Sequence, residues 1–123
     1  MDTLLFLLKN MIPYMIPLTV VALGGMFSER SGIVNIALEG IMVFGASIGI
    51  FFMYFFPDLF PPQMMLIAAL IVALISGAIF SLLHAYASVN LKANQVISGT
   101  ALNLFATSFH VFVARIVTPN GVE

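Results

Sequence analysis

The chain alternates between long apolar stretches and short polar interruptions. Its nine charged residues leave four long uncharged stretches, at residues 10–28, 40–57, 59–91 and 93–114. A helix needs about 20 apolar residues to cross the roughly 30 Å hydrocarbon core of a bilayer. The pattern therefore predicts an all-α, multi-pass transmembrane helix bundle with about four spans. The predicted spans are residues 11–27, 37–56, 63–87 and 96–117.

The first predicted span contains two prolines, Pro13 and Pro17. Proline removes a backbone N–H and bends a helix, which membrane spans tolerate when neighbouring groups satisfy the freed carbonyls. We therefore expect this span to be bent. Leu4–Leu8, just before it, either extends the helix or lies in the membrane interface.

A polar segment, GGMFSERSGIVNIALEG at residues 24–40, separates the first two predicted spans. It holds Glu29, Arg30 and Glu39 together with four glycines. Such a segment is costly in a bilayer unless protein or water satisfies it, which makes it a candidate functional site. Two interpretations stay open: a broken or re-entrant segment within the membrane, or a solvated loop. If it is helical, Asn35 and Glu39 share one face because they are four residues apart.

Small residues recur at helical spacing in the second and third spans. Gly45 and Gly49 form a GxxxG pair, and a small residue returns every fourth position along the third span. Small residues let helix backbones approach closely, so simple helix packing is the favoured interpretation. The candidate packing residues are Gly45, Gly49, Ala73, Gly77 and Ser81.

Polar side chains form a stripe along the fourth span. Thr100, Asn103, Thr107 and His110 fall on one face of a helix. Such a stripe faces either the bundle interior or a watery path, and interior packing is slightly favoured. His84, near the end of the third span, is a candidate proton or ligand group, although a hydrogen bond at the membrane boundary is the favoured interpretation.

Composition supports the membrane assignment and narrows the function. The chain is 62% hydrophobic and 7% charged with a mean hydropathy of +1.15, whereas soluble domains carry about 25% charged residues. The net charge of −1 and the lack of a basic run argue against nucleic-acid binding. The chain has no cysteine, and its histidines and acids are scattered. We therefore predict no catalytic residues, no metal site and no cofactor of its own. Lys9 and Arg115 balance Arg30 and Lys92, so charge alone gives no orientation.

Two blocks carry a resemblance to a known family. SERSG, NI and LEG in residues 24–40, and LLHAYASVNLKANQVISGTALNL at 82–104, resemble permease subunits of ABC importers for nucleosides and simple sugars, within the ribose and branched-chain amino acid permease group. The resemblance implies that residues 1–123 are the N-terminal part of a permease more than twice as long, in the plasma or inner membrane. This part alone is not expected to transport. The implied cytoplasmic loop residues are Arg30, Lys92, Asn94 and Gln95.

The resemblance also implies a function and partners. The chain would help to translocate a nucleoside or simple sugar together with a second permease subunit, an ATP-binding cassette subunit that binds and hydrolyses the ATP, and an extracytoplasmic substrate-binding lipoprotein. The alternative is a small, self-associating structural or pore-forming membrane protein. The candidate substrate-pathway residues are Ser28, Asn35, Glu39, Asn103 and Thr107.

Overall fold

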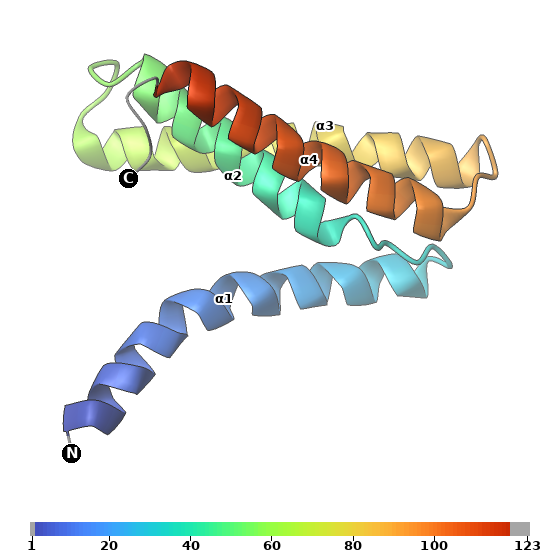
Figure 1. The fold of residues 1–123 in the computed structure, drawn as a ribbon, viewed down its shortest axis with the longest axis horizontal. Coiled ribbons are helices and arrows are strands. Elements are labelled where there is room, and N and C mark those ends of the chain that lie inside the picture. Colours follow the sequence, from blue (N-terminus) through green and yellow to red (C-terminus); the bar gives the residue numbers. More distant parts are fainter. Residues whose placement is uncertain (1, 119–123) are drawn as a thin grey trace. The chain divides into compact units, whose positions relative to one another are not determined.

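The computed structural model describes residues 2–118 and contains four helices in this range (Figure 1). They are α1 (Asp2–Arg30), α2 (Leu38–Phe55), α3 (Pro62–Val89) and α4 (Gln95–Val117). Each helix is long and apolar enough to cross a membrane, which confirms the predicted all-α class with four spans. The chain divides into two compact units, one that ends at Val34 and one that begins at Asn35.

The helix boundaries match the predicted spans closely except at the amino terminus. α2, α3 and α4 begin and end within two residues of the predicted positions. The first span was placed at 11–27, but α1 begins at Asp2, so Leu4–Leu8 continue the helix. Its 29 residues extend over about 43 Å, which is longer than a bilayer core and requires tilt, bending or exposed ends.

α1 stays helical through the residues that disfavour a helix. Pro13 and Pro17 lie inside it, and Figure 1 shows the expected bend along its first half. Gly24 and Gly25 do not break it either. A helical glycine costs only about 1 kcal/mol, which is small beside the cost of unpaired backbone groups in lipid. The interruption is therefore shorter than residues 24–40 and covers 31–37 only.

A glycine in the left-handed region ends α1. Gly32 has a φ of 85°, which L side chains rarely adopt. Its N–H donates to Glu29 O at 3.0 Å, and the N–H of Ile33 donates to Ser28 O at 3.3 Å. These two bonds form a Schellman motif, which satisfies the carbonyls that a helix end leaves unpaired.

In the second unit, the small residues place α2 directly against α3. An added Cβ on Gly45 would lie 2.8 Å from Ala73 O, and one on Gly49 would lie 3.0 Å from Ala69 O. An added Cβ on Gly77 would lie 3.6 Å from Ile41 O, which is an ordinary contact. The two backbones therefore touch along this seam, and at Gly45 and Gly49 no larger side chain fits without a shift.

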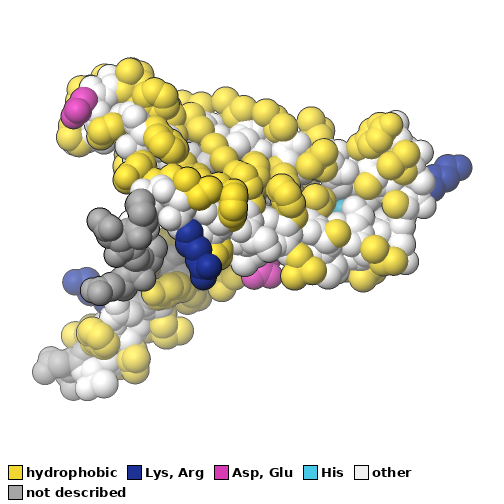
Figure 2. Space-filling model, turned by 45° about the horizontal axis from the view of Figure 1, so that its top comes forward, with side chains coloured by type: hydrophobic (Ala, Val, Ile, Leu, Met, Phe, Trp, Pro, Cys, Tyr) yellow, Lys and Arg dark blue, Asp and Glu magenta, His cyan; other side chains and the backbone are white. Residues whose placement is uncertain are grey.

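An aromatic cluster fills the junction of α2, α3 and α4. Phe44 stacks on Phe80 with ring centroids 4.3 Å apart, and Phe109 lies 5.2 Å from Phe44. Phe105 joins them at 6.0 Å from Phe80. Outside this core the helices expose large apolar side chains such as Leu74, at 72%, and Figure 2 shows hydrophobic side chains over most of the visible surface. Such a surface suits lipid or other membrane helices.

The second unit has two different ends. At one end Tyr54 donates from its hydroxyl to Val117 O at 3.2 Å, which ties the last turns of α2 and α4 together. At the other end Asn94 caps α4, because its Oδ1 accepts from the N–H of Val96 at 2.9 Å and of Ile97 at 3.3 Å. The start of α2 lies near this second end, where the polar groups described below gather.

Candidate functional site

Side-chain amides satisfy the irregular backbone that leads into α2. Asn35 Oδ1 accepts from the N–H of Ala37 at 3.0 Å. Asn103, on α4, accepts from the N–H of Gly40 at 2.7 Å and donates from Nδ2 to Ile36 O at 2.9 Å. Two asparagines thus pair three backbone groups, which is the requirement for non-helical backbone at membrane depth.

The irregular residues lie beside α4 rather than beyond its end. An added Cβ on Gly99 would lie 2.9 Å from Ile36 Cβ and 3.0 Å from Ala37 N, so the link touches α4 at this position. Gly99 is about 6 Å along the helix from Gln95, and Asn103 is about 12 Å along it. Ala37 itself is fully buried, at 0% exposure. Protein therefore covers one side of this interruption, as the interpretation of a broken segment requires.

Asn35 and Glu39 do not share a helical face as predicted. α2 begins at Leu38, so Asn35 lies in the link and only Glu39 is helical. The helix begins late because Asn35 turns its side chain back to the Ala37 N–H, a local bond that competes with helix formation. Glu39 lies in the first turn of α2 with its side chain exposed.

The polar stripe on α4 divides into two kinds of residue. Asn103 and His110 reach α2, at Gly40 and at Ser47. Thr107 is exposed and donates to Asn103 O at 3.0 Å, and Thr100 likewise bonds within its own helix. The stripe therefore serves helix packing through two members and leaves two hydroxyls on the open side.

The partner of His110 is a residue that sequence analysis missed. Ser47 is 2% exposed, and its Oγ lies 2.8 Å from His110 Nδ1. The same hydroxyl donates to Val43 O at 2.6 Å. A hydroxyl has one hydrogen, so Ser47 accepts from His110, whose Nδ1 then carries the proton. Ser47 lies two residues from both Gly45 and Gly49, so on the helix it faces away from their contacts with α3 and toward α4, a face that the small-residue pattern did not single out.

Two residues predicted to have functional roles, Ser28 and Arg30, lie at the end of α1. Ser28 donates from its hydroxyl to Ile33 O at 2.9 Å, and its own carbonyl accepts from Ser31. Arg30 is the last helical residue and is exposed. Ser28 belongs to the unit that ends at Val34, whereas the other pathway candidates belong to the second unit.

The predicted loop residues connect α3 to α4. Lys92 is exposed and adopts a left-handed φ of 49°, Asn94 is the N-cap described above, and Gln95 is the first residue of α4. Near this loop His84 is 2% exposed, and its Nδ1 lies 3.3 Å from Ser98 Oγ. The imidazole therefore joins α3 to α4, which fits the hydrogen-bonding interpretation.

The packing candidates face each other within the chain. Gly45 and Gly77 approach at the α2–α3 seam, and Ala73 contacts both Gly45 and Gly49. Ser81 is half-buried and donates to Ala78 O at 2.7 Å. The close contacts of this seam are used inside the monomer, which removes the surface on which the self-associating alternative rested.

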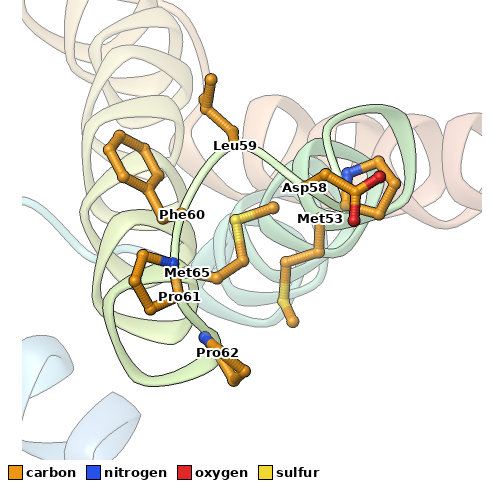
Figure 3. Close-up of a pocket in the computed structure, with 8 residues that line it drawn as sticks. Met53, Asp58, Leu59, Phe60, Pro61, Pro62 and Met65 are labelled. Atoms are coloured by element: carbon orange, nitrogen blue, oxygen red, sulfur yellow. The ribbon is translucent and has the colours of Figure 1, made fainter.

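A hollow of about 590 Å³ lies at the other end, around the turn between α2 and α3. It is lined by two methionines and by the proline-rich turn, with Asp58 as its charged member (Figure 3). Within residues 2–118, no three His, Cys, Asp or Glu side chains come close enough to hold a metal ion. This part of the chain thus offers polar binding groups but no cluster of metal ligands.

Comparison with known proteins assigns the family. Residues 7–122 match the family described as the permease component of the branched-chain amino acid transport system. The chain belongs to this permease family. As a member with four apolar helices, it is a multi-pass membrane protein.

Several bacterial and archaeal permeases are similar to this chain. It is 43% identical over 120 residues to the nucleoside ABC transporter permease protein NupC of Lactococcus lactis, covering 98% of this chain and 38% of that protein. It is 42% identical over 107 residues to the guanosine ABC transporter permease protein NupQ of Bacillus subtilis, covering 85% and 32%.

A third similar protein is the putative glucose ABC transporter permease protein TsgC13 of Haloferax volcanii. The identity is 34% over 95 residues, covering 77% of this chain and 27% of that protein. The chain thus spans about a third of the length of the relatives it matches. No solved structure matches it.

Proposed function

We propose that this chain forms part of the membrane pathway of an ABC importer for nucleosides. The observation that carries the proposal is the sequence identity of 42–43% to permeases named for nucleoside and guanosine transport. The site is compatible with it, because polar groups at the start of α2 meet α4 inside an otherwise apolar bundle.

The chemistry of the open polar groups favours a neutral, hydrogen-bonding solute. Thr100 and Thr107 are uncharged and exposed on α4, and their oxygens can still accept a hydrogen bond. Glu39 adds an acceptor on the first turn of α2. A zwitterionic amino acid would instead need a matched pair of charges to replace its hydration. We therefore favour a nucleoside over a branched-chain amino acid.

The remaining parts of the transporter would come from partners. An ATP-binding cassette subunit would bind and hydrolyse ATP, a second permease subunit would complete the pathway, and a lipoprotein would deliver the solute outside. In this arrangement the loop with Lys92 faces the cytoplasm, and the α2–α3 turn with Asp58 faces the binding protein. This chain would itself need no cofactor.

Uptake in cells that produce the complete permease containing this chain, together with the partner subunits, tests the proposal. Radiolabelled guanosine should accumulate, and excess unlabelled adenosine or cytidine should compete, whereas glucose and leucine should not. The matched control is the same strain with an inactive ATP-binding subunit, which should take up none. Competition by leucine but not by nucleosides would overturn the proposed substrate class. Co-purification of the tagged chain without an ATP-binding subunit would overturn the proposed assembly.

A further inference from the structure

A side chain of α4 takes the place of the missing side-chain cap at the start of α2. Ala37 occupies the N-cap position and makes no side-chain cap bond. The N–H of Gly40, at the third helical position, would ordinarily bond to such a cap. Here Asn103 Oδ1 accepts it at 2.7 Å, while Asn103 Nδ2 donates to Ile36 O at 2.9 Å. One amide therefore caps α2 from a different helix.

The two backbone groups held by Asn103 are also potential partners of each other. Ile36 and Gly40 are four residues apart, so the N–H of Gly40 would bond Ile36 O if α2 began one residue earlier. The next rung already exists, because Ile41 donates to Ala37 O at 2.9 Å. Withdrawal of the amide therefore need not leave either backbone group unpaired. Both arrangements satisfy the backbone, as exchange between two states requires.

Contacts at the same place join α4 to the link. Gly99 packs against Ile36, and an added Cβ on Gly40 would lie 2.8 Å from Asn103 Cα, so the backbones nearly touch. The hydroxyls of Thr100 and Thr107 bond within α4 and do not hold the link. A shift of α4 would therefore act on the start of α2 mainly through the Gly99 and Asn103 contacts.

We propose that Asn103 is a two-position latch that couples the position of α4 to the length of the link at residues 31–37. In one position its amide caps α2, as observed here. In the other it withdraws, Gly40 bonds Ile36, and α2 begins earlier at the expense of the link. The inference rests on the proposed function, since the two positions would correspond to the two sides to which a transporter opens. Asn103 is a positioning residue and need not touch the solute.

Hydrogen exchange at the Gly40 amide tests the latch without any transport. The full chain in lipid nanodiscs would be compared with Asn103→Ala and with Ser108→Ala, a control at an exposed position further along α4. If Gly40 can bond Ile36, its amide stays protected in Asn103→Ala and exchanges less than about fivefold faster than in the wild type, since the loss of one cap with no replacement bond would give about that change. If Asn103 is a fixed cap, protection falls further in Asn103→Ala alone, and this result would overturn the latch.

Thiol labelling in the assembled transporter tests the coupling. The chain contains no cysteine, so Ile36→Cys supplies a single probe on the link, at a side chain that is 37% exposed. Its labelling rate should differ between the nucleotide-free and the vanadate-trapped transporter, and Asn103→Ala should remove the difference while Ser108→Ala keeps it. If the Ile36→Cys transporter with Asn103 intact is labelled at the same rate in both nucleotide states and still takes up solute, the latch would be overturned but the proposed function would not. If this Ile36→Cys transporter takes up no solute, while the Gly40 amide stays protected as predicted in both variants of the hydrogen-exchange test, the result would count against the proposed function alone.

Discussion

At the scale of single residues, asparagine and serine behave differently in this chain. Asn103 combines a donor and an acceptor on one short side chain, so it can pair two backbone groups on another segment. The hydroxyls of Thr19, Thr107 and Ser81 instead return to carbonyls three or four residues earlier in their own helices. A hydroxyl that bonds its own helix therefore does not identify the segment beside it, whereas the bonds of Asn103 to Gly40 and Ile36 do.

The close approach of Gly40 to Asn103 gives a direct prediction. In Gly40→Ala the new Cβ would lie 2.6 Å from Asn103 Oδ1 and 2.8 Å from Asn103 Cα, so α2 and α4 must move apart. We expect a loss of about 1–3 kcal/mol in stability, measured by thermal unfolding in detergent. Gly24→Ala is the matched control, because its Cβ meets nothing within 4 Å among the described residues. A neutral Gly40→Ala would contradict the observed contact.

The bond between Ser47 and His110 predicts a second effect. Ser47→Ala removes the acceptor of a buried 2.8 Å bond between α2 and α4. Interhelical hydrogen bonds in membrane proteins contribute about 0.6 kcal/mol on average, up to about 1.7, and we expect a loss in this range. Thr100→Val should be near neutral because Thr100 is exposed and bonds within its own helix. Denaturant unfolding of the two variants would measure this. Equal losses of stability in Ser47→Ala and Thr100→Val would count against the bond between Ser47 and His110.

At the scale of elements, the apolar lengths predicted the helices well, but not the details of where they stop. A bilayer allows few alternatives to a helix, so four uncharged stretches were enough to locate α2, α3 and α4. The doublet Gly24-Gly25 looked like a break yet is helical, whereas the actual stop is Gly32 at a φ of 85°. The presence of glycine in the sequence does not tell the helical doublet from the glycine that ends the helix, because the two differ only in backbone conformation.

The candidate site was predicted in part for a similar reason. The stripe on α4 was visible from its spacing, but the link is held by contacts between Asn103 and residues more than 60 positions earlier. Helical periodicity carries no information about which segment faces a given stripe. The Ser47–His110 bond and the four-phenylalanine cluster were missed because their members come from different helices.

The seam between α2 and α3 makes a prediction at this scale. Gly45→Ala would place its Cβ 2.8 Å from Ala73 O, whereas the Cβ of Gly77→Ala would lie 3.6 Å from its nearest neighbour. We expect Gly45→Ala to lower stability by about 1–3 kcal/mol and Gly77→Ala to change it little. Thermal unfolding of both variants in the same lipid would measure this. The reverse order would show that the seam is packed differently.

At the scale of the whole molecule, the second unit is an apolar bundle with a polar region near the end that carries the α3–α4 loop. Asn103, Glu39 and residues 35–37 of the link lie there, while the other end carries the bond from Tyr54 to Val117 and the hollow at the proline-rich turn. The relatives are about three times as long, so further helices are expected to cover the exposed polar face of α4. We propose that this region borders a water-filled path for a neutral solute.

Solute protection at Glu39 tests that claim most directly. Glu39→Cys would be introduced into the assembled transporter and treated with a water-soluble thiol reagent, with and without guanosine. The account predicts that the residue is labelled, and that guanosine slows the labelling while leucine does not. If the thiol reacts freely at the same rate in every condition, or never reacts, the region does not border the solute path and the account is wrong.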